Sequence, residues 1–123
     1  MDQSLYDQVG ADFFTSLVNA FYARVASDEV LRPMYPADLT ESRGHLTAFL
    51  IQYWGGPTRY QEERGHPRLR LRHAPFAITA DARDAWLSAM TGALGDVRGE
   101  VTDEQYAELR GYFEMAAHQL RNV

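Results

Sequence analysis

Apolar residues recur three or four positions apart along most of the chain, which is the spacing of one face of an α-helix. The clearest stripe lies in residues 14–25, after Asp12, a residue type that commonly caps a helix N-terminus. Asp28 is expected to cap a short turn over residues 29–32, which stops at Pro33. The core positions predicted for the first of these helices are Phe14, Leu17, Val18, Phe21, Tyr22 and Val25.

Three more helices are predicted further along the chain. One begins after Thr40 and ends at Gly55-Gly56-Pro57, because glycine adopts the left-handed conformation at a helix C-terminus and proline cannot continue a helix. Another begins after Thr79, and the last begins at Thr102-Asp103-Glu104-Gln105, a capping box. Their predicted buried stripes are Leu46, Phe49, Leu50 and Tyr53; Trp86, Met90, Ala93, Leu94 and Val97; and Tyr106, Leu109, Phe113, Ala116, Ala117 and Leu120.

One long segment, residues 56–79, has a different pattern. An arginine–leucine alternation within it is strand-like, but no other stretch alternates to pair with it. Helical spacing instead places Leu69, His73 and Phe76 on one face, which favours a short helix ending near Pro75. We therefore predict a mostly irregular loop that contains this helix. A loop of this length inside a compact domain is usually functional.

Length and composition are those of an ordinary globular domain. The 123 residues are 46% hydrophobic and 24% charged, so we expect one all-α domain over residues 1–123, with about five main helices in two layers. No apolar run approaches the ~18 residues that span a membrane, and no secretory signal begins the chain. Cysteine is absent, which excludes disulfides and thiolate metal sites. We expect a cytoplasmic protein that does not bind a membrane.

The basic residues, all of them arginine, are unevenly distributed in a chain of net charge −5. Residues 59–73 contain five arginines and two glutamates, so this segment carries a net positive charge. The rest of the chain is strongly acidic. Such an island favours a small anion over nucleic acid, because the rest of the surface would repel a polyanion. A solvated arginine-rich loop is the alternative. The five arginines are Arg59, Arg64, Arg68, Arg70 and Arg72.

His73 is the strongest candidate for a metal ligand. It lies on the same predicted helix face as the apolar residues Leu69 and Phe76. A neutral imidazole there can bind iron or zinc through one nitrogen, while the N–H of its other nitrogen donates to the backbone carbonyl of Leu69. Zinc needs three or four convergent ligands, but His45, His66 and His118 are scattered and cysteine is absent. A lone histidine indicates a metal that brings its own equatorial ligands, which haem iron does. A core histidine satisfied by hydrogen bonds is the alternative.

Aromatic residues with polar tips also fall on the predicted core stripes. Tyr22, Tyr35, Tyr53 and Trp86 each need a hydrogen-bond partner when buried. If they converge, they form a donor cluster for a ligand; if they are scattered, backbone carbonyls satisfy them. The arginine-rich island flanks His73, and arginine pairs well with carboxylates such as haem propionates. No nucleophile elbow, phosphate loop or dinucleotide fingerprint is present.

Taken together, these motifs resemble those of group II truncated haemoglobins, over nearly the whole chain. The most specific stretches are Phe21-Tyr22, Tyr35-Pro36, Gln52-Tyr53-Trp54-Gly55-Gly56-Pro57 and residues 64–76, continued by residues 83–87 and 114–118. The resemblance implies a truncated-globin two-over-two helical sandwich around haem b (iron protoporphyrin IX). It also implies reversible binding of dioxygen and of other diatomic ligands such as NO or CO.

The resemblance further implies roles for individual residues. His73 matches the proximal iron ligand, and the Trp86 indole matches a distal donor toward bound ligand. Ser42 takes the place of the globin distal histidine. The expected cofactor-binding residues are His73, Tyr22, Tyr35, Leu46, Arg72, Phe76, Trp86 and His45, and the expected ligand-facing residues are Tyr22, Tyr35, Trp86 and Ser42.

Two other functions stay open at this point. The same donors would serve a haem redox enzyme, an NO dioxygenase or a peroxidase-like protein, which would need an external reductase because the chain has no flavin motif. A haem-free helical interaction module is the more distant alternative. The sequence does not decide whether the protein is an enzyme. We expect a monomer or a homodimer.

Overall fold

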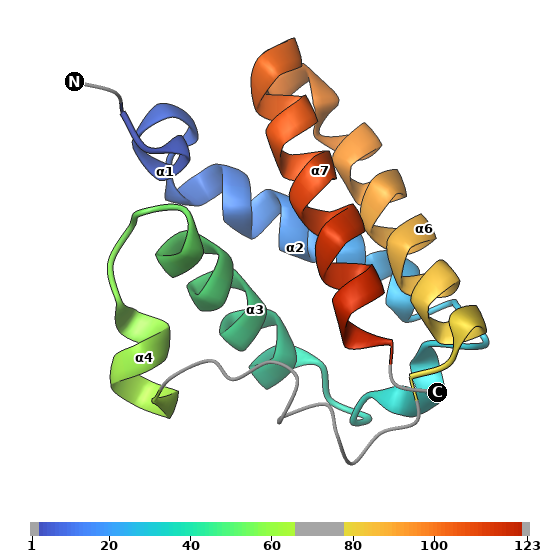
Figure 1. The fold of residues 1–123 in the computed structure, drawn as a ribbon. Coiled ribbons are helices and arrows are strands. Elements are labelled where there is room, and N and C mark those ends of the chain that lie inside the picture. Colours follow the sequence, from blue (N-terminus) through green and yellow to red (C-terminus); the bar gives the residue numbers. More distant parts are fainter. Residues whose placement is uncertain (1–2, 66–77, 122–123) are drawn as a thin grey trace.

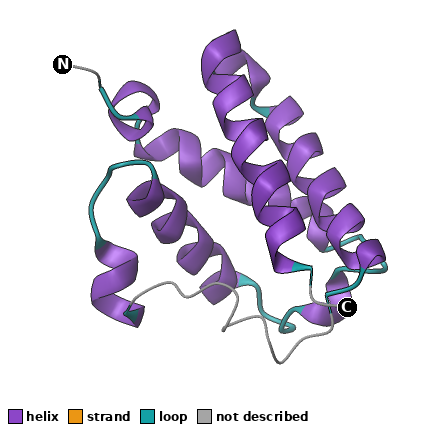
Figure 2. Cartoon of the chain, in the orientation of Figure 1, coloured by secondary structure: helices purple, strands orange, loops and turns teal. Residues whose placement is uncertain are grey.

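The computed structural model describes residues 3–65 and 78–121, and within these ranges it contains helices and no strand. Figure 2 shows this all-helical content, which confirms the predicted fold class for the described part of the chain. None of the described helices is long and apolar enough to cross a membrane. The helices are α1 (Leu5–Val9), α2 (Ala11–Val25), η1 (Arg32–Met34), α3 (Thr40–Tyr53), α4 (Arg59–Arg64), α6 (Ala80–Asp96), η2 (Arg98–Glu100) and α7 (Asp103–Leu120).

The four long helices pack as two pairs (Figure 1). Helices α6 and α7 lie side by side and antiparallel, joined through η2, and α2 packs against both α3 and α6. The α2–α3 pair therefore covers the α6–α7 pair, which is the two-layer packing expected from the sequence. The core fills the space between the pairs, because each helix turns its apolar stripe inward.

The stripe of α2 is buried as predicted, and the stripes of the other long helices are buried in large part. All six core positions predicted for α2 are less than 9% exposed, and Met90, Ala93 and Leu94 of α6 are equally buried. Tyr53 is the exception, because it is 49% exposed at the end of α3. The prediction that Tyr53 belongs to the buried face is wrong: the rings of Tyr112 and Trp54 contact it, at 4.2 and 5.0 Å between ring centroids, but leave half of it exposed.

Two of the predicted helix caps are confirmed. Thr79 accepts the N–H of Ala82 at 3.1 Å, and Thr102 and Gln105 form the complete capping box. Two others are wrong. Asp12 lies inside the first turn of α2, because Gly10 with φ +82° makes the corner between α1 and α2. Thr40 is the first residue of α3 rather than its cap.

The connections between the long helices also differ from the prediction. Asp28 caps the turn after α2 as expected, by accepting the N–H groups of Val30 and Leu31, but a 3₁₀ turn then continues through Pro33. Proline fits there because the first turn of a helix leaves its N–H groups unpaired. Helix α4 lies where only loop was predicted, supported by an ion pair between Arg59 and Glu63. The helix predicted to end near Pro75 lies outside the described residues.

The capping box of α7 gives a first testable prediction. Thr102→Ala removes the acceptor for the N–H of Gln105 and is expected to lower the free energy of unfolding by about 1 kcal/mol. Thr58 is the matched control, because it precedes α4 in the same position but caps no backbone N–H. Thr58→Ala is expected to change stability by less than about 0.5 kcal/mol. Urea denaturation of both variants measures the difference, and equal losses would contradict the assignment.

Candidate functional site

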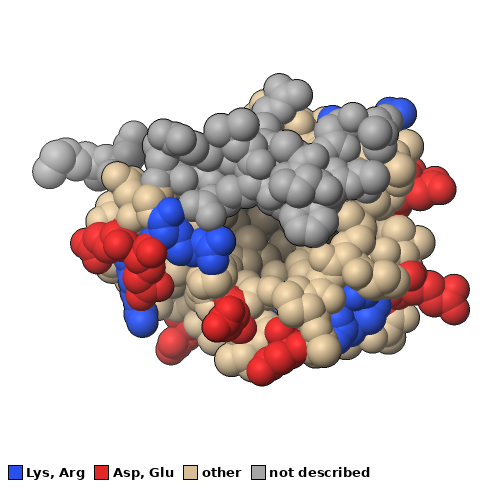
Figure 3. All heavy atoms as spheres, turned by 90° about the horizontal axis from the view of Figure 1, so that it is seen from below, with Lys and Arg blue, Asp and Glu red and all other residues tan. Residues whose placement is uncertain are grey.

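A cavity of about 380 Å³ lies where the end of α7, the start of α6, η1 and α3 meet. Figure 3 views the molecule from this end and shows a hollow in the surface there. Apolar side chains form most of the described walls. They are Leu31, Met34, Pro36, Leu46, Phe49, Leu50, Ile78, Ala82, Phe113, Ala116, Ala117 and Leu120.

Three aromatic residues with polar tips meet at this cavity from three different elements. Tyr22 comes from α2, Tyr35 from the residue after η1, and Trp86 from α6. The rings of Tyr22 and Tyr35 pack edge to face with their centroids 5.6 Å apart, and Trp86 hydrogen-bonds Tyr35. The structure thus forms a donor cluster from these three side chains. Tyr53, the fourth residue of this kind, does not line the cavity among the described residues.

Burial keeps both phenols of the cluster protonated. Burial, followed by the nearby Tyr35, raises the pKa of Tyr22 well above its usual value, although a hydrogen bond with Ser42 opposes this. Burial likewise raises the pKa of Tyr35 to about 12, against the opposing hydrogen bond from Trp86. At neutral pH both hydroxyls therefore carry a proton that they can donate into the cavity.

These raised pKa values predict how stability changes in alkaline solution. In the unfolded chain a tyrosine loses its proton near pH 10, whereas folded Tyr35 holds its proton up to about pH 12. The folded state therefore binds more protons between these values, so the free energy of unfolding falls as pH rises from 10 to 12. Tyr35→Phe is expected to flatten this fall, measured by urea denaturation at several pH values. Tyr6→Phe is the control, and an equal slope in wild type and Tyr35→Phe would contradict the prediction.

Helix α3 supplies the next wall of the cavity. Ser42 accepts the hydroxyl hydrogen of Tyr22 through its backbone carbonyl, at a long 3.4 Å. Leu46 adds an apolar surface one turn further along. His45 lies at the edge, where Arg64 donates to its imidazole with 2.8 Å between Nη1 and Nδ1. All three side chains expected on this helix thus line the cavity.

Further residues of the cavity were not among the site residues expected from the sequence. Arg64 and Arg83 line it, and Arg83 also pairs with Asp84 at 3.0 Å. Tyr60 and Tyr112 contribute two more phenols. Arg64 belongs to the arginine-rich island, which was the only signal for it. The expected cofactor residues His73, Arg72 and Phe76 lie outside the described residues.

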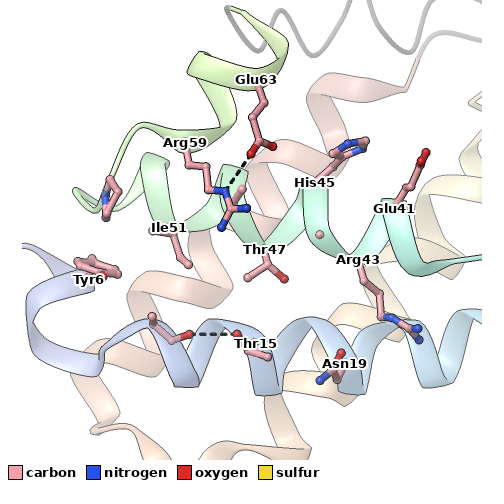
Figure 4. Close-up of a pocket in the computed structure, with 14 residues that line it drawn as sticks. Tyr6, Thr15, Asn19, Glu41, Arg43, His45, Thr47, Ile51, Arg59 and Glu63 are labelled. Carbon is pink, nitrogen blue, oxygen red and sulfur yellow. Dashed lines mark hydrogen bonds and ion pairs between the residues drawn. The ribbon is translucent and has the colours of Figure 1, made fainter.

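A second groove lies on the other side of α3, between α2 and α4 (Figure 4). It is larger, about 630 Å³, but its rim consists largely of exposed side chains, including the Arg59–Glu63 ion pair. Thr15, Asn19 and Thr47 point into it, and the described residues that line it include no cluster of aromatic donors. His45 borders both hollows. The aromatic cavity is the better candidate for a cofactor site.

The described walls of this cavity fit a haem. An apolar slot suits the faces of a porphyrin, and two arginines at the edge suit its carboxylates. Within residues 3–65 and 78–121, no group of three or more His, Cys, Asp or Glu could hold a metal ion by itself.

Comparison with known proteins identifies the class to which this fold belongs. Residues 4–122 match the family of bacterial-like globins. The chain is 44% identical over 119 residues to Group 2 truncated hemoglobin YjbI of Bacillus subtilis, covering 95% of this chain and 87% of the relative. It is 32% identical over 122 residues to Group 2 truncated hemoglobin 3-1 of Lotus japonicus, covering 95% and 71%.

Solved structures agree with this result. The hemoglobin of Chloroflexus aurantiacus superposes with a TM-score of 0.94 at 44% identity, covering 99% of this chain and 100% of the other. The truncated oxygen-avid haemoglobin of Bacillus subtilis superposes with a TM-score of 0.92 at 43% identity, covering 98% and 100%. The fold is a globin fold, and the chain belongs to the group 2 truncated haemoglobins. Membership implies a haem cofactor and haem-based binding of oxygen.

Proposed function

We propose that this protein binds dioxygen, and other diatomic ligands such as NO and CO, reversibly at a haem b held in the aromatic cavity, with His73 as the iron ligand. One observation carries the proposal: Tyr22, Tyr35 and Trp86 bring three polar tips to a cavity that is otherwise largely apolar. When bound, the haem supplies an iron with one free position for a diatomic gas. The matching relatives that are named as truncated haemoglobins support the assignment.

The cavity residues then determine how tightly a ligand is held. A bound gas that takes up partial negative charge would be stabilised by hydrogen bonds donated by the Tyr22 and Tyr35 hydroxyls and the Trp86 N–H. Each such bond contributes roughly 1–3 kcal/mol when water is excluded. The apolar side chains of Leu46 and Phe49 exclude that water.

Residues at the edge of the cavity are proposed to bind the cofactor rather than the gas. Arg64 and the neighbouring His45 provide N–H groups for a propionate, and Arg72 is proposed as a further partner. Phe76 is proposed to pack against the ring. Ser42 takes part through its backbone carbonyl, which holds the Tyr22 hydroxyl until a ligand competes for it.

Tight binding favours some physiological roles over others. The relative from Bacillus subtilis is described as oxygen-avid, and the donor cluster gives this chain the same tendency. Slow release suits sensing, scavenging or redox chemistry better than bulk delivery of oxygen. An external reductase, a monomeric or homodimeric state and a cytoplasmic location remain predictions.

The absorption spectrum of the purified chain tests the proposal. After incubation with haem, we expect a Soret band, a five-coordinate ferrous spectrum and a reversible change when dioxygen is added and removed. A chain that stays colourless with haem in excess would overturn the proposal. A ferrous spectrum that dioxygen does not change would overturn gas binding while leaving the cofactor in place.

A further inference from the structure

Two tyrosines connect the cavity with the protein surface. Tyr112 of α7 lines the cavity, and its ring lies 4.2 Å from the ring of Tyr53, measured between centroids. Tyr53, at the end of α3, is 49% exposed. Trp54, which is buried, packs against both rings at 4.9 and 5.0 Å. An oxidisable side chain in the cavity is thus in ring contact with an oxidisable side chain at the surface.

A second row of rings starts from the donor cluster, at Trp86, but is interrupted. Trp86 contacts Phe113 at 5.9 Å, and Phe113 contacts Trp54 at the same separation. A phenyl ring has no hydroxyl or N–H and is much harder to oxidise than a phenol or an indole. Electrons would therefore pass more readily through the Tyr112–Tyr53 contact than through Phe113.

We propose that Tyr112 and Tyr53 form a relay that supplies single electrons from the surface to the cavity while hydrogen peroxide is reduced there. The proposal rests on the proposed function, because it needs a haem in the cavity. It assigns the peroxide-dependent oxidation of phenols to a surface site that is separate from the gas-binding pocket. The phenol reacts at Tyr53 and does not enter the cavity.

The chemistry of the relay balances. Hydrogen peroxide takes up two electrons and two protons in the cavity and becomes two water molecules. For each electron, Tyr53 gives up its hydroxyl proton to solvent and becomes a neutral phenoxyl radical. A soluble phenol then transfers a hydrogen atom to that radical and restores the tyrosine. One peroxide and two phenols thus yield two water molecules and two phenoxyl radicals.

Exposure determines which tyrosine keeps the radical. Burial, with a smaller contribution from Tyr53, raises the pKa of Tyr112 to about 12, which shows how poorly its surroundings accommodate a change of charge. An oxidised phenol must release its proton, and Tyr112 is less exposed to water than Tyr53. Tyr53 is half exposed, so its proton can pass directly to water. The radical should therefore settle on Tyr53.

Radical trapping in the haem-loaded chain tests the relay. After addition of hydrogen peroxide, freeze-quenched EPR should show a tyrosyl radical, and a nitroso spin trap should label Tyr53, located by mass spectrometry. Tyr53→Phe should abolish this label, and Tyr112→Phe should remove most of it although Tyr53 is still present. Oxidation of guaiacol should fall in both variants. Tyr106→Phe is the matched control, because Tyr106 lies on α7 against Arg98 and outside the cavity lining.

The possible failures are distinguishable. If the loaded chain reduces peroxide but the label lies elsewhere, or if Tyr112→Phe leaves the label on Tyr53 unchanged, the relay is overturned and the proposed gas binding stands. If the chain takes up no haem, the proposed function and the relay are overturned together. Because phenylalanine keeps the ring contacts of both positions, a loss of label cannot be assigned to unfolding when the variants retain the wild-type Soret band.

Discussion

Replacing His73 by glycine is expected to weaken haem retention by at least about 100-fold. Removing a residue that merely orients a metal ligand costs about 10–100-fold in metal affinity, so removing the ligand itself costs at least as much. Among the described residues that line the cavity, His45 is the only histidine, and its imidazole contacts Arg64 at the edge. The rate at which haem passes from the chain to an excess of an apo-globin acceptor measures the effect.

Imidazole and a second histidine provide the controls for this experiment. Free imidazole fits the space that the glycine leaves and should restore the ferrous spectrum of the wild type. His66 lies in the same segment of the sequence but has no predicted contact with iron, so His66→Gly should retain haem normally. An unchanged spectrum and rate of haem loss in His73→Gly would remove His73 from the site.

The long helices could be predicted because their buried faces repeat with a helical period. Helix α2 shows this best, since every predicted core position is buried. Helix α4 has only six residues and buries just Tyr60, so its sequence contains no stripe to detect. Tyr53 shows a second limit: periodicity tells which face a residue occupies, but not whether a neighbouring helix reaches far enough to cover it.

Periodicity alone predicts the candidate site less well than it predicts the helices. Tyr22, Tyr35 and Trp86 come from three elements that are up to 64 positions apart, and spacing within one helix cannot show that they converge. The resemblance to a family supplied that expectation, and the cavity brings the same three residues together. The contact between Arg64 and His45 joins α4 to α3 across a stretch of 19 positions. No local pattern could have revealed it.

Trp86→Phe is expected to speed oxygen dissociation about tenfold. The phenyl ring should preserve the contacts of Trp86 with Phe21 and Phe113, at 5.6 and 5.9 Å, so the main loss is the indole N–H. One lost hydrogen bond of ~1.4 kcal/mol corresponds to that factor of ten. Stopped-flow displacement of oxygen by CO measures the rate, with Tyr6→Phe as a control outside the cavity.

Tyr35→Phe decides whether the donors act as a unit. The Trp86 N–H donates a hydrogen bond to the Tyr35 hydroxyl. When one of the two groups is removed, the remaining one either turns toward the ligand or loses its fixed orientation. Residues that share a hydrogen-bond network are not additive, so the double variant should release oxygen less than about 100-fold faster than wild type. A product of the two single effects would show that each donor reaches the ligand independently. An off-rate unchanged in both single variants would place the barrier to release outside the cluster.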